Sequence, residues 1–322
     1  MSITLSVVIP NYNGAAFLPA CLRSVFSQIT SNCEVVLVDD GSSDHSVDLV
    51  RQNFADELRS GQFTLICTEN AGPGAARNVG VQAARGSYVA FLDSDDFILP
   101  GYIARILAVL SDSAPDIVQF NLLRVLDDDL RGEQLIVCHM SPDGLYKMDA
   151  VRDEIFGLGK WFPPSRVFAR EIILANPFPA ERVFYEDLQL LPFIFFQDLT
   201  VVLIADPLIA YRDNPHGTTR NHKPEHAKTM LSFFTRLSAL PPSVPRDLIR
   251  VQVARSIVFL ALELKLREID LCGLRRQIRG LENKPILAAH LGRADRFFLQ
   301  LPSIYTAIDW GRKQFRDFTS GV

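Results

Sequence analysis

The sequence is poor in the features that mark disulfide-rich proteins, zinc modules and membrane proteins. It has five cysteines among 322 residues, an odd number without a Cys-x-x-Cys pair. This excludes a disulfide framework and a zinc knuckle and predicts reduced thiols in the cytoplasm. No apolar run approaches the roughly 18 residues of a membrane span. The opening segment, MSITLSVVIPNYNG, has no basic residues before its short apolar run, so we expect a strand and not a signal peptide.

A strong excess of positive charge is also missing. Lys and Arg number 33 against 37 Asp and Glu, for a net charge of -4, which argues against general nucleic-acid binding. The charge is uneven, because residues 231–322 contain 15 Lys or Arg and 8 Asp or Glu, about +7, whereas residues 1–230 carry about -11. A basic C-terminal region indicates an anionic surface as a possible partner.

Four short apolar runs divide the first hundred residues, and each ends in a polar cluster. These predicted strands cover residues 5–9, 35–38, 63–67 and 88–92. Segments with helical spacing lie between them, and further strands are expected over residues 116–125 and 201–205. The alternation predicts an α/β fold with a mostly parallel sheet covered by helices on both faces. Because ligands collect at the carboxyl ends of such strands, the polar clusters should share one rim.

The chemistry-bearing residues of this rim each have an ordinary structural alternative. Asp93 and Asp95 form an Asp-x-Asp directly after a strand, which suits a hard divalent cation but is also typical of a solvated turn. Asp40, in an acidic turn after another strand, could accept hydrogen bonds from a base or ribose, or merely belong to a helix cap. Arg77, at the start of a helix, could bind phosphate or lie free on the surface.

Four segments occur in a specific order and spacing: SVVIPNYN, VVLVDDGSSD, ENAGPGAARNVGVQAARGSYVAFLDSDD and FYEDLQL. Together they resemble the family 2 glycosyltransferases, inverting nucleotide-sugar enzymes of the GT-A fold. The resemblance covers roughly residues 3–215. It implies a GT-A glycosyltransferase domain over residues 1–220, and the amphipathic pattern that follows predicts a helical region over residues 221–322.

The resemblance implies roles in binding the donor, a UDP-sugar. Pro10 and Tyr12 would flank the nucleotide, with the Tyr12 ring near the base. Asp40 would recognise the base, usually uracil. Arg77 would help to hold the nucleotide, and Asp93 would contact the ribose or the sugar. The expected donor site is therefore shared by the loops that follow four strands.

The same resemblance implies a metal ligand and a base. Asp95 would ligate Mn²⁺ or Mg²⁺, whereas Asp96 is expected to be structural. Asp187 would deprotonate the acceptor hydroxyl on the face opposite the leaving group, and Glu186 could position the acceptor. Without the resemblance, both would pass for acids favoured by a helix N-terminus. His216 is an alternative metal or phosphate contact, although a loop histidine is more often only solvated.

The acceptor is expected to be a glycan or a lipid-linked saccharide of a cell-surface polysaccharide pathway. Trp161 and Phe162 could stack on its sugar rings or belong to the core. Residues 246–279 predict amphipathic helices that pack on the transferase, dock on anionic lipid at the inner face of the membrane, or form an oligomer interface. A further candidate for lipid contact comprises Phe297, Phe298, Trp310, Arg312, Lys313, Phe315 and Arg316.

Two other functions fit the layout less well. A sugar-phosphate nucleotidyltransferase also needs carboxylate-bound Mg²⁺, but it is expected to have a Gly-rich, basic phosphate turn after the first strand. Here that turn is PNYNG, without a basic residue. A catalytically inactive sugar-binding or scaffold protein is the second alternative. The intact acids Asp40, Asp95 and Asp187 argue against it.

Overall fold

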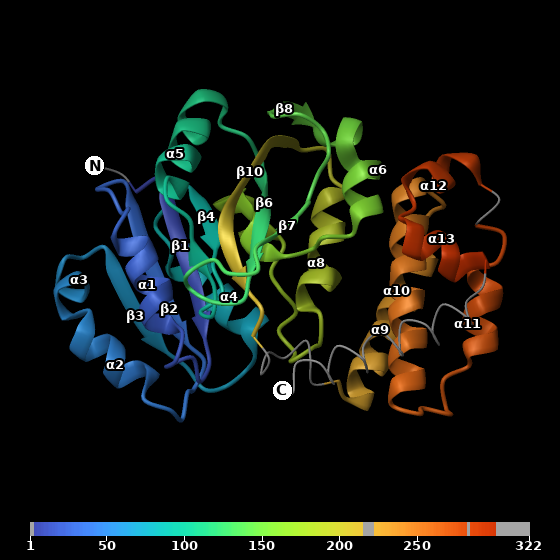
Figure 1. The fold of residues 1–322 in the computed structure, drawn as a ribbon, viewed down its shortest axis with the longest axis horizontal. Helices are drawn as coiled ribbons and strands as arrows, with labels where there is room; N and C mark the ends of the chain where they lie inside the picture. The colour runs from blue at the N-terminus through green and yellow to red at the C-terminus, as the bar shows by residue number, and fades with distance from the viewer. Residues whose placement is uncertain (1–2, 215–221, 282–283, 301–322) are drawn as a thin grey trace. The chain divides into compact units, whose positions relative to one another are not determined.

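The computed structural model describes residues 3–214, 222–281 and 284–300 (Figure 1). These residues form two compact units. The first contains the described residues of 1–151 and 160–214, and the second contains those of 152–159 and 215–322. The expected division of function between a catalytic domain over residues 1–220 and a helical region over residues 221–322 stays a prediction.

A single ten-stranded sheet forms the frame of the first unit. Its strands follow the order β3-β2-β1-β4-β9-β6-β10-β5, with β7 paired to β6 and β8 paired to β10. The strand bounds are β1 Leu5–Asn11, β2 Cys33–Asp39, β3 Phe63–Cys67, β4 Tyr88–Phe91, β5 Phe97–Ile98, β6 Ile117–Val125, β7 Gln134–Ile136, β8 Gly144–Lys147, β9 Arg166–Ala169 and β10 Thr200–Arg212. All seven residues of β1 and of β2 are buried, as expected for central strands with covered faces.

The strand directions place the carboxyl ends of the longer strands at one rim. β1 is parallel to β2 and β4, β2 is parallel to β3, and β6 is parallel to β10. Since β9 lies antiparallel between β4 and β6, these two strands also share a direction. Six strands therefore run one way, which confirms the predicted α/β class. The others, β5, β7, β8 and β9, are short and run the opposite way.

Helices pack on this sheet through apolar stripes. The helices with most of their residues in the first unit are α1 Leu18–Phe26, α2 Ser46–Asn53, α3 Ala55–Arg59, α4 Pro73–Ala83, α5 Tyr102–Ser113, α7 Arg170–Ala175 and α8 Glu186–Phe195. In α1 the buried residues Leu18, Cys21, Leu22 and Val25 keep the spacing of one helix face. In α4, a Cβ on Gly80 would lie 2.3 Å from Cγ1 of Val8, so only glycine permits this close approach to β1.

The second unit is helical. It contains most of α6 Met148–Leu158 and all of α9 Pro224–Ala239, α10 Val244–Glu263, α11 Leu271–Ile278, α12 Pro285–His290 and α13 Arg293–Gln300. The side chain of Gln252 on α10 donates to the carbonyl oxygen of Phe156 on α6 at 2.6 Å. No helix among the described residues is long and apolar enough to cross a membrane. Phe298 is buried, whereas Trp310, Arg312, Lys313, Phe315 and Arg316 lie outside the described residues.

Candidate active site

The loops that follow β1 and β2 are joined by hydrogen bonds at the carboxyl rim. Asp39 accepts from Nδ2 of Asn11 at 2.8 Å and from the backbone N–H of Ser42 at 2.9 Å. The backbone N–H of Asn13 donates to Oγ of Ser42 at 2.8 Å. Tyr12 lies within this ordered loop and is 50% exposed. The loop thus exposes an aromatic ring at the rim, and such a ring is a favourable surface for stacking.

Asp40 joins the loop after β2 to the loop after β3. Its carboxylate is 3% exposed and accepts from the backbone N–H groups of Ala71 at 2.9 Å and Gly72 at 2.8 Å. Gly72 has φ of 99°, a conformation that favours glycine, and it directly precedes α4. Each carboxylate oxygen has a second lone pair, so Asp40 retains the capacity to accept from a base N–H. Pro10, by contrast, is a buried residue of β1.

Arg77 connects two acids that are far apart in the sequence. Its side chain, on α4, is 5% exposed. Nη2 donates to Oδ1 of Asp93 at 2.7 Å, and Nη1 donates to Oε1 of Glu186 at 2.6 Å. The two carboxylates hold the pKa of the buried guanidinium above its ordinary value despite burial. Arg77 therefore stays charged, and it links the end of β4 to the start of α8.

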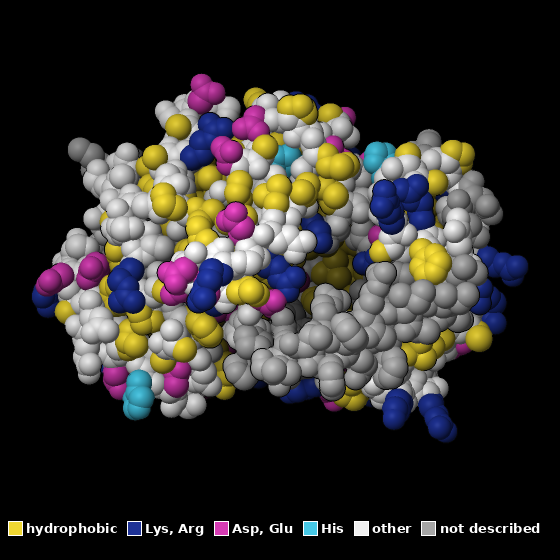
Figure 2. Space-filling view, in the orientation of Figure 1, with side chains coloured by type: hydrophobic (Ala, Val, Ile, Leu, Met, Phe, Trp, Pro, Cys, Tyr) yellow, Lys and Arg dark blue, Asp and Glu magenta, His cyan; other side chains and the backbone are white. Residues whose placement is uncertain are grey.

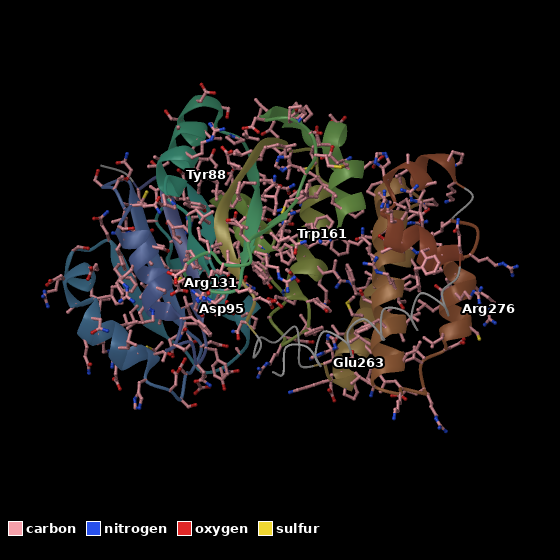
Figure 3. All side chains as sticks on the ribbon, viewed as in Figure 1. Tyr88, Asp95, Arg131, Trp161, Glu263 and Arg276 are labelled. Atoms are coloured by element: carbon pink, nitrogen blue, oxygen red, sulfur yellow. The ribbon has the colours of Figure 1, made fainter. Side chains whose placement is uncertain are left out.

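The acids after β4 carry more negative charge than their neighbours neutralise. Asp95 lies at the carboxyl edge of the sheet (Figure 3), where Nδ2 of Asn214 donates to its Oδ2 at 3.0 Å. Asp96 is 1% exposed and accepts from the backbone N–H of Arg212 at 2.8 Å. Burial, and then repulsion from Asp93, raises the pKa of Asp95, and burial together with its acidic neighbours raises that of Asp96.

This donor set fits a divalent cation that arrives with a diphosphate. Among the described residues, no group of three or more His, Cys, Asp or Glu could hold a metal by itself. Mg²⁺ and Mn²⁺ sites of nucleotide enzymes typically use one or two carboxylates and complete the shell with phosphate oxygens and water. Asp95, whose pKa is raised by burial and then by repulsion from Asp93, suits such a shell. His216 lies outside the described residues.

Asp187 lies in the first turn of α8, next to Glu186. Burial, followed by repulsion from Glu186, raises the pKa of Asp187 to about 7, against the opposing effects of the Leu188 N–H and Arg77. That N–H donates to Oδ1 of Asp187 at 2.7 Å. The preceding residue, Tyr185, has φ of 56°, which is uncommon for an aromatic residue and is found mostly where the surroundings enforce it. A carboxylate with a pKa near neutrality is suited to general base catalysis.

Comparisons with known proteins identify the fold and the class of enzyme. Residues 6–156 match the family model described as glycosyl transferase family 2. EpsH of Bacillus subtilis strain 168, named a glycosyltransferase, is 27% identical over 291 residues, which cover 88% of this chain and 83% of that protein. The chain is a glycosyltransferase whose residues 6–156 match family 2. A glycosyltransferase of Nostoc is 35% identical over 182 residues, 56% of this transferase and 54% of the relative.

Solved structures support the GT-A fold of the transferase. The structure of Staphylococcus aureus TarS residues 1–349 with UDP-GlcNAc has a TM-score of 0.67 at 17% identity and covers 97% of this chain and 92% of that one. The mannosyltransferase PcManGT of Pyrobaculum calidifontis, with GDP-Man and Mn²⁺, has a TM-score of 0.54 at 17% identity, with coverages of 96% and 87%. At these identities the likeness establishes the fold alone.

A buried arginine near Asp187 was not predicted from the sequence of the transferase. Arg166 of β9 is fully buried and donates to the carbonyl oxygens of Lys160 at 2.6 Å and Phe162 at 2.9 Å. Its guanidinium lies over the rings of Trp161 and Phe195, at 5.6 and 5.0 Å from their centroids. Burial lowers its pKa to about 10, and the charge of Asp187 opposes this effect. The available signal was a basic residue between the aromatic residues of the stretch GKWFPPSRVFAR, which also contains Lys160 and Arg170.

The aromatic residues expected near the acceptor have different environments. Trp161 is 5% exposed and packs edge-on against Phe195 at 5.7 Å, so it belongs to the core of the transferase. Phe162 is partly buried and contacts the ring of Tyr211 at 5.5 Å. Tyr211 belongs to the segment that, by the family resemblance, is expected to close over the active site; burial and the surrounding acids raise its pKa above the ordinary value. Its phenol therefore lies in the field of the rim acids.

Proposed function

We propose that this glycosyltransferase moves a sugar from a UDP-sugar to an acceptor hydroxyl with inversion at the anomeric carbon. The observation that carries the proposal is the arrangement of two acidic groups joined by Arg77. Asp93 stands on the side of the predicted donor site, and Glu186 stands beside the predicted base, Asp187. One guanidinium links an acid of the proposed donor site to Glu186, the neighbour of the proposed base, in a way that a nucleotide-binding module without acceptor chemistry does not require. The UDP-GlcNAc bound to TarS supports UDP as the nucleotide.

In the proposed reaction, Asp187 accepts the proton of the acceptor hydroxyl while its oxygen attacks the anomeric carbon. A new C–O bond forms on one face of the sugar, and the bond to the β-phosphate oxygen breaks on the other, so that UDP departs with the electron pair. A pKa of about 7 leaves Asp187 ionised in part at neutral pH and keeps it basic enough to assist the attack. The single displacement inverts the anomeric configuration.

The donor is proposed to bind across the loops of the rim. The half-exposed ring of Tyr12 would stack on the base beside Pro10, and Asp40 would accept from its N–H. Asp93 would accept from a hydroxyl of the ribose or the sugar. Asp95 would hold Mn²⁺ or Mg²⁺, which neutralises the negative charge of the departing diphosphate when bound.

The acceptor is proposed to be a growing glycan or a lipid-linked saccharide of a cell-surface polysaccharide. In this proposal, the second unit docks at the cytoplasmic face of a membrane through a basic helix surface. The α11 helix buries Leu274 and Ile278 and exposes Arg275 and Arg276, with Arg279 following. Figure 2 shows Lys and Arg side chains in dark blue at the right edge of the view, where Figure 1 draws α11. Such a surface has the charge expected of a site for anionic lipid headgroups.

A panel of nucleotide sugars, each with Mn²⁺, Mg²⁺ or a chelator, tests the proposal directly. We expect a UDP-sugar to bind and to release UDP only when a divalent cation is present. The anomeric configuration of the product, read by NMR, should be opposite to that of the donor. Binding of no nucleotide sugar under any metal condition would refute the proposal, and retention of configuration would refute the inverting mechanism.

A further inference from the structure

The link made by Arg77 crosses long distances in the sequence. Asp93 lies 16 residues from Arg77, and Glu186 lies 109 residues from it. The contacts are 2.7 and 2.6 Å long, and the side chains of Asp93 and Glu186 are only 28% and 16% exposed. Partly buried ion pairs of this length are far less screened by water and salt than pairs on the surface. The link is therefore a stiff connection between two elements of the site.

We infer that Arg77 is a positioning residue, which fixes the start of α8, and with it Asp187, relative to the acids that follow β4. The inference rests on the proposed role of Asp187 as the base. It assigns to Arg77 a task inside the protein, beyond any contact with the nucleotide. It also explains why Glu186, which raises the pKa of the base, is held beside it.

The charges around Arg77 favour this role over the binding of phosphate. One guanidinium between two carboxylates leaves a net charge of about -1, which repels a diphosphate. Two of the three nitrogens of Arg77 donate to these acids, and the buried Nε has no acceptor among the described residues. The centroid of the Phe178 ring lies 5.5 Å from Cζ of Arg77, so the ring covers one face of the guanidinium. Both Nη atoms of the guanidinium thus donate to carboxylates of the protein.

The packing of α4 keeps Arg77 in place. A Cβ on Gly74 would lie 3.4 Å from Cγ of Glu186, so the starts of α4 and α8 are in close contact. Nδ2 of Asn78, the next residue of α4, donates to the carbonyl oxygen of Phe178 at 2.9 Å. Because α4 is also held against β1 at Gly80, a displacement of α8 requires the Arg77 contacts to break. The geometry permits a sharp test.

The test compares Arg77→Gln and Arg77→Lys with the unaltered protein. Turnover, UDP affinity by calorimetry, thermal unfolding and amide hydrogen exchange over residues 185–190 are measured on the full chain. For Arg77→Gln we expect kcat to fall about a hundredfold, the cost of misplacing a reacting group by about 1 Å. UDP affinity should change by less than about threefold, and exchange in the first turn of α8 should become about tenfold faster.

Arg77→Lys separates charge from geometry. A lysine ammonium is a compact charge on a flexible stem and cannot bridge two carboxylates as a planar guanidinium does. We expect Arg77→Lys to fold as the unaltered protein does. Amide exchange in the first turn of α8 should be as fast as in Arg77→Gln. The kcat of Arg77→Lys should stay about tenfold low. Full recovery of kcat and protection by lysine would show that charge alone suffices and would refute positioning.

Arg85→Gln is the matched control. Arg85 also forms a 2.7 Å ion pair with a buried acid, Glu34, but at the start of β2, the opposite end of the strands from the site. We expect it to leave kcat, UDP affinity and α8 exchange within about twofold. A parallel loss of UDP affinity and kcat in Arg77→Gln would assign Arg77 to the nucleotide and overturn the inference.

Hydrogen exchange keeps the inference separate from the proposed function. If the unaltered protein transferred no sugar, the proposed function would fail, while exchange at α8 would still report whether Arg77 holds that helix. Unchanged exchange in Arg77→Gln would refute positioning even in an active enzyme. Faster exchange that is absent from Arg85→Gln would support it.

Discussion

The two units of the molecule each bury a cluster of charged side chains, and the clusters are opposite in sign. In the first unit, Arg77 lies between Asp93 and Glu186 and near Asp187, so that acids exceed bases. In the second unit, one acid, Asp247, is surrounded by three bases. Burial is common to both clusters, so it cannot be what distinguishes a site from a structural anchor.

The cluster of the second unit is fully paired. Asp247 accepts from Arg246 at 2.6 Å, from Arg250 at 3.3 Å and from Lys284 at 2.8 Å. Burial alone would raise the pKa of Asp247, but the hydrogen bonds from Lys284 and Arg246 hold it below the usual range. Nη1 of Arg246 and Nη2 of Arg250 donate to the carbonyl oxygens of Leu240 and Gln277. Such a carboxylate is permanently ionised and has no capacity to take a proton at neutral pH.

The rim cluster differs in its deficit of positive charge. Asp187 has a pKa raised to about 7, because burial and Glu186 together outweigh the Leu188 N–H and Arg77. The uncompensated negative charge destabilises the folded state, and binding of a proton or a cation removes this destabilisation. An acid with too few partners is thus available for chemistry, whereas one with an excess of partners stabilises the fold.

The largest effect is expected from Asp187→Asn, which tests whether the acid at the rim takes part in the chemistry. The substitution keeps the size of the side chain and removes its basicity, so we expect kcat to fall by about a hundred- to ten-thousandfold. UDP affinity should be unchanged. The matched control is Asp198→Asn, at an exposed acid soon after the end of α8, which should leave kcat unaltered. Full turnover in Asp187→Asn would show that the base is a different residue.

Substitution of the paired acid in the second unit should lower the stability of the protein and not its turnover. Asp247→Asn leaves three buried or half-buried cations without their acid, and the loss of one partner of a buried pair costs about 3 to 5 kcal/mol. Urea unfolding monitored on this unit should show that decrease in free energy. Glu268→Gln, at an exposed acid of the same unit, should change it by less than about 0.5 kcal/mol. An Asp247→Asn protein as stable as the original would mean that the cluster contributes little.

The strands and the rim loops were predictable because their signals are local. Apolar runs ending in polar clusters marked β1, β2, β3 and β4, and the helix start at FYEDLQL placed the acids of α8. The strands β5, β7, β8 and β9 were not predicted. They contain two to four residues each and form only because a longer strand offers an edge or a gap for antiparallel pairing.

The partners of the rim residues were beyond sequence reasoning for a related reason. Arg77 could equally have been a surface residue, since the acids that accept its hydrogen bonds lie 16 and 109 residues away. Arg166 was missed because the aromatic stretch around it predicts core, where an unpaired arginine is unexpected. Motif spacing located the acids. Their charge balance, however, depends on which residues from distant parts of the sequence lie next to them in the folded protein.

A smaller effect is expected when the basic surface of α11 is neutralised. If Arg275 and Arg276 contact anionic lipid, replacing both by Gln should weaken partition onto phosphatidylglycerol vesicles about thirtyfold, at about 1 kcal/mol per charge. Sedimentation of the full chain with vesicles measures this. Arg23 and Arg51, exposed on helices of the first unit, form the control pair with the same change of charge. Equal losses for the two pairs would assign the binding to net charge alone.

The smallest effect tests the charge balance of the proposed base, Asp187. Asp187 must be ionised to accept a proton, so kcat should rise with pH through about 7. The charged and titratable groups in its surroundings are Glu186, Arg77, Asp93, Arg166 and Tyr211.

Glu186 raises the pKa of Asp187, and Arg77 lowers it. Glu186→Gln should therefore move the rise in kcat to lower pH, whereas Arg77→Gln should move it to higher pH, each by on the order of half a unit. Both substitutions break the same 2.6 Å contact and both should lower the maximal rate. General loosening of the site would displace the two profiles in the same direction. Opposite displacements can arise only if the charges of the acid and the arginine act directly on the carboxylate that takes the proton.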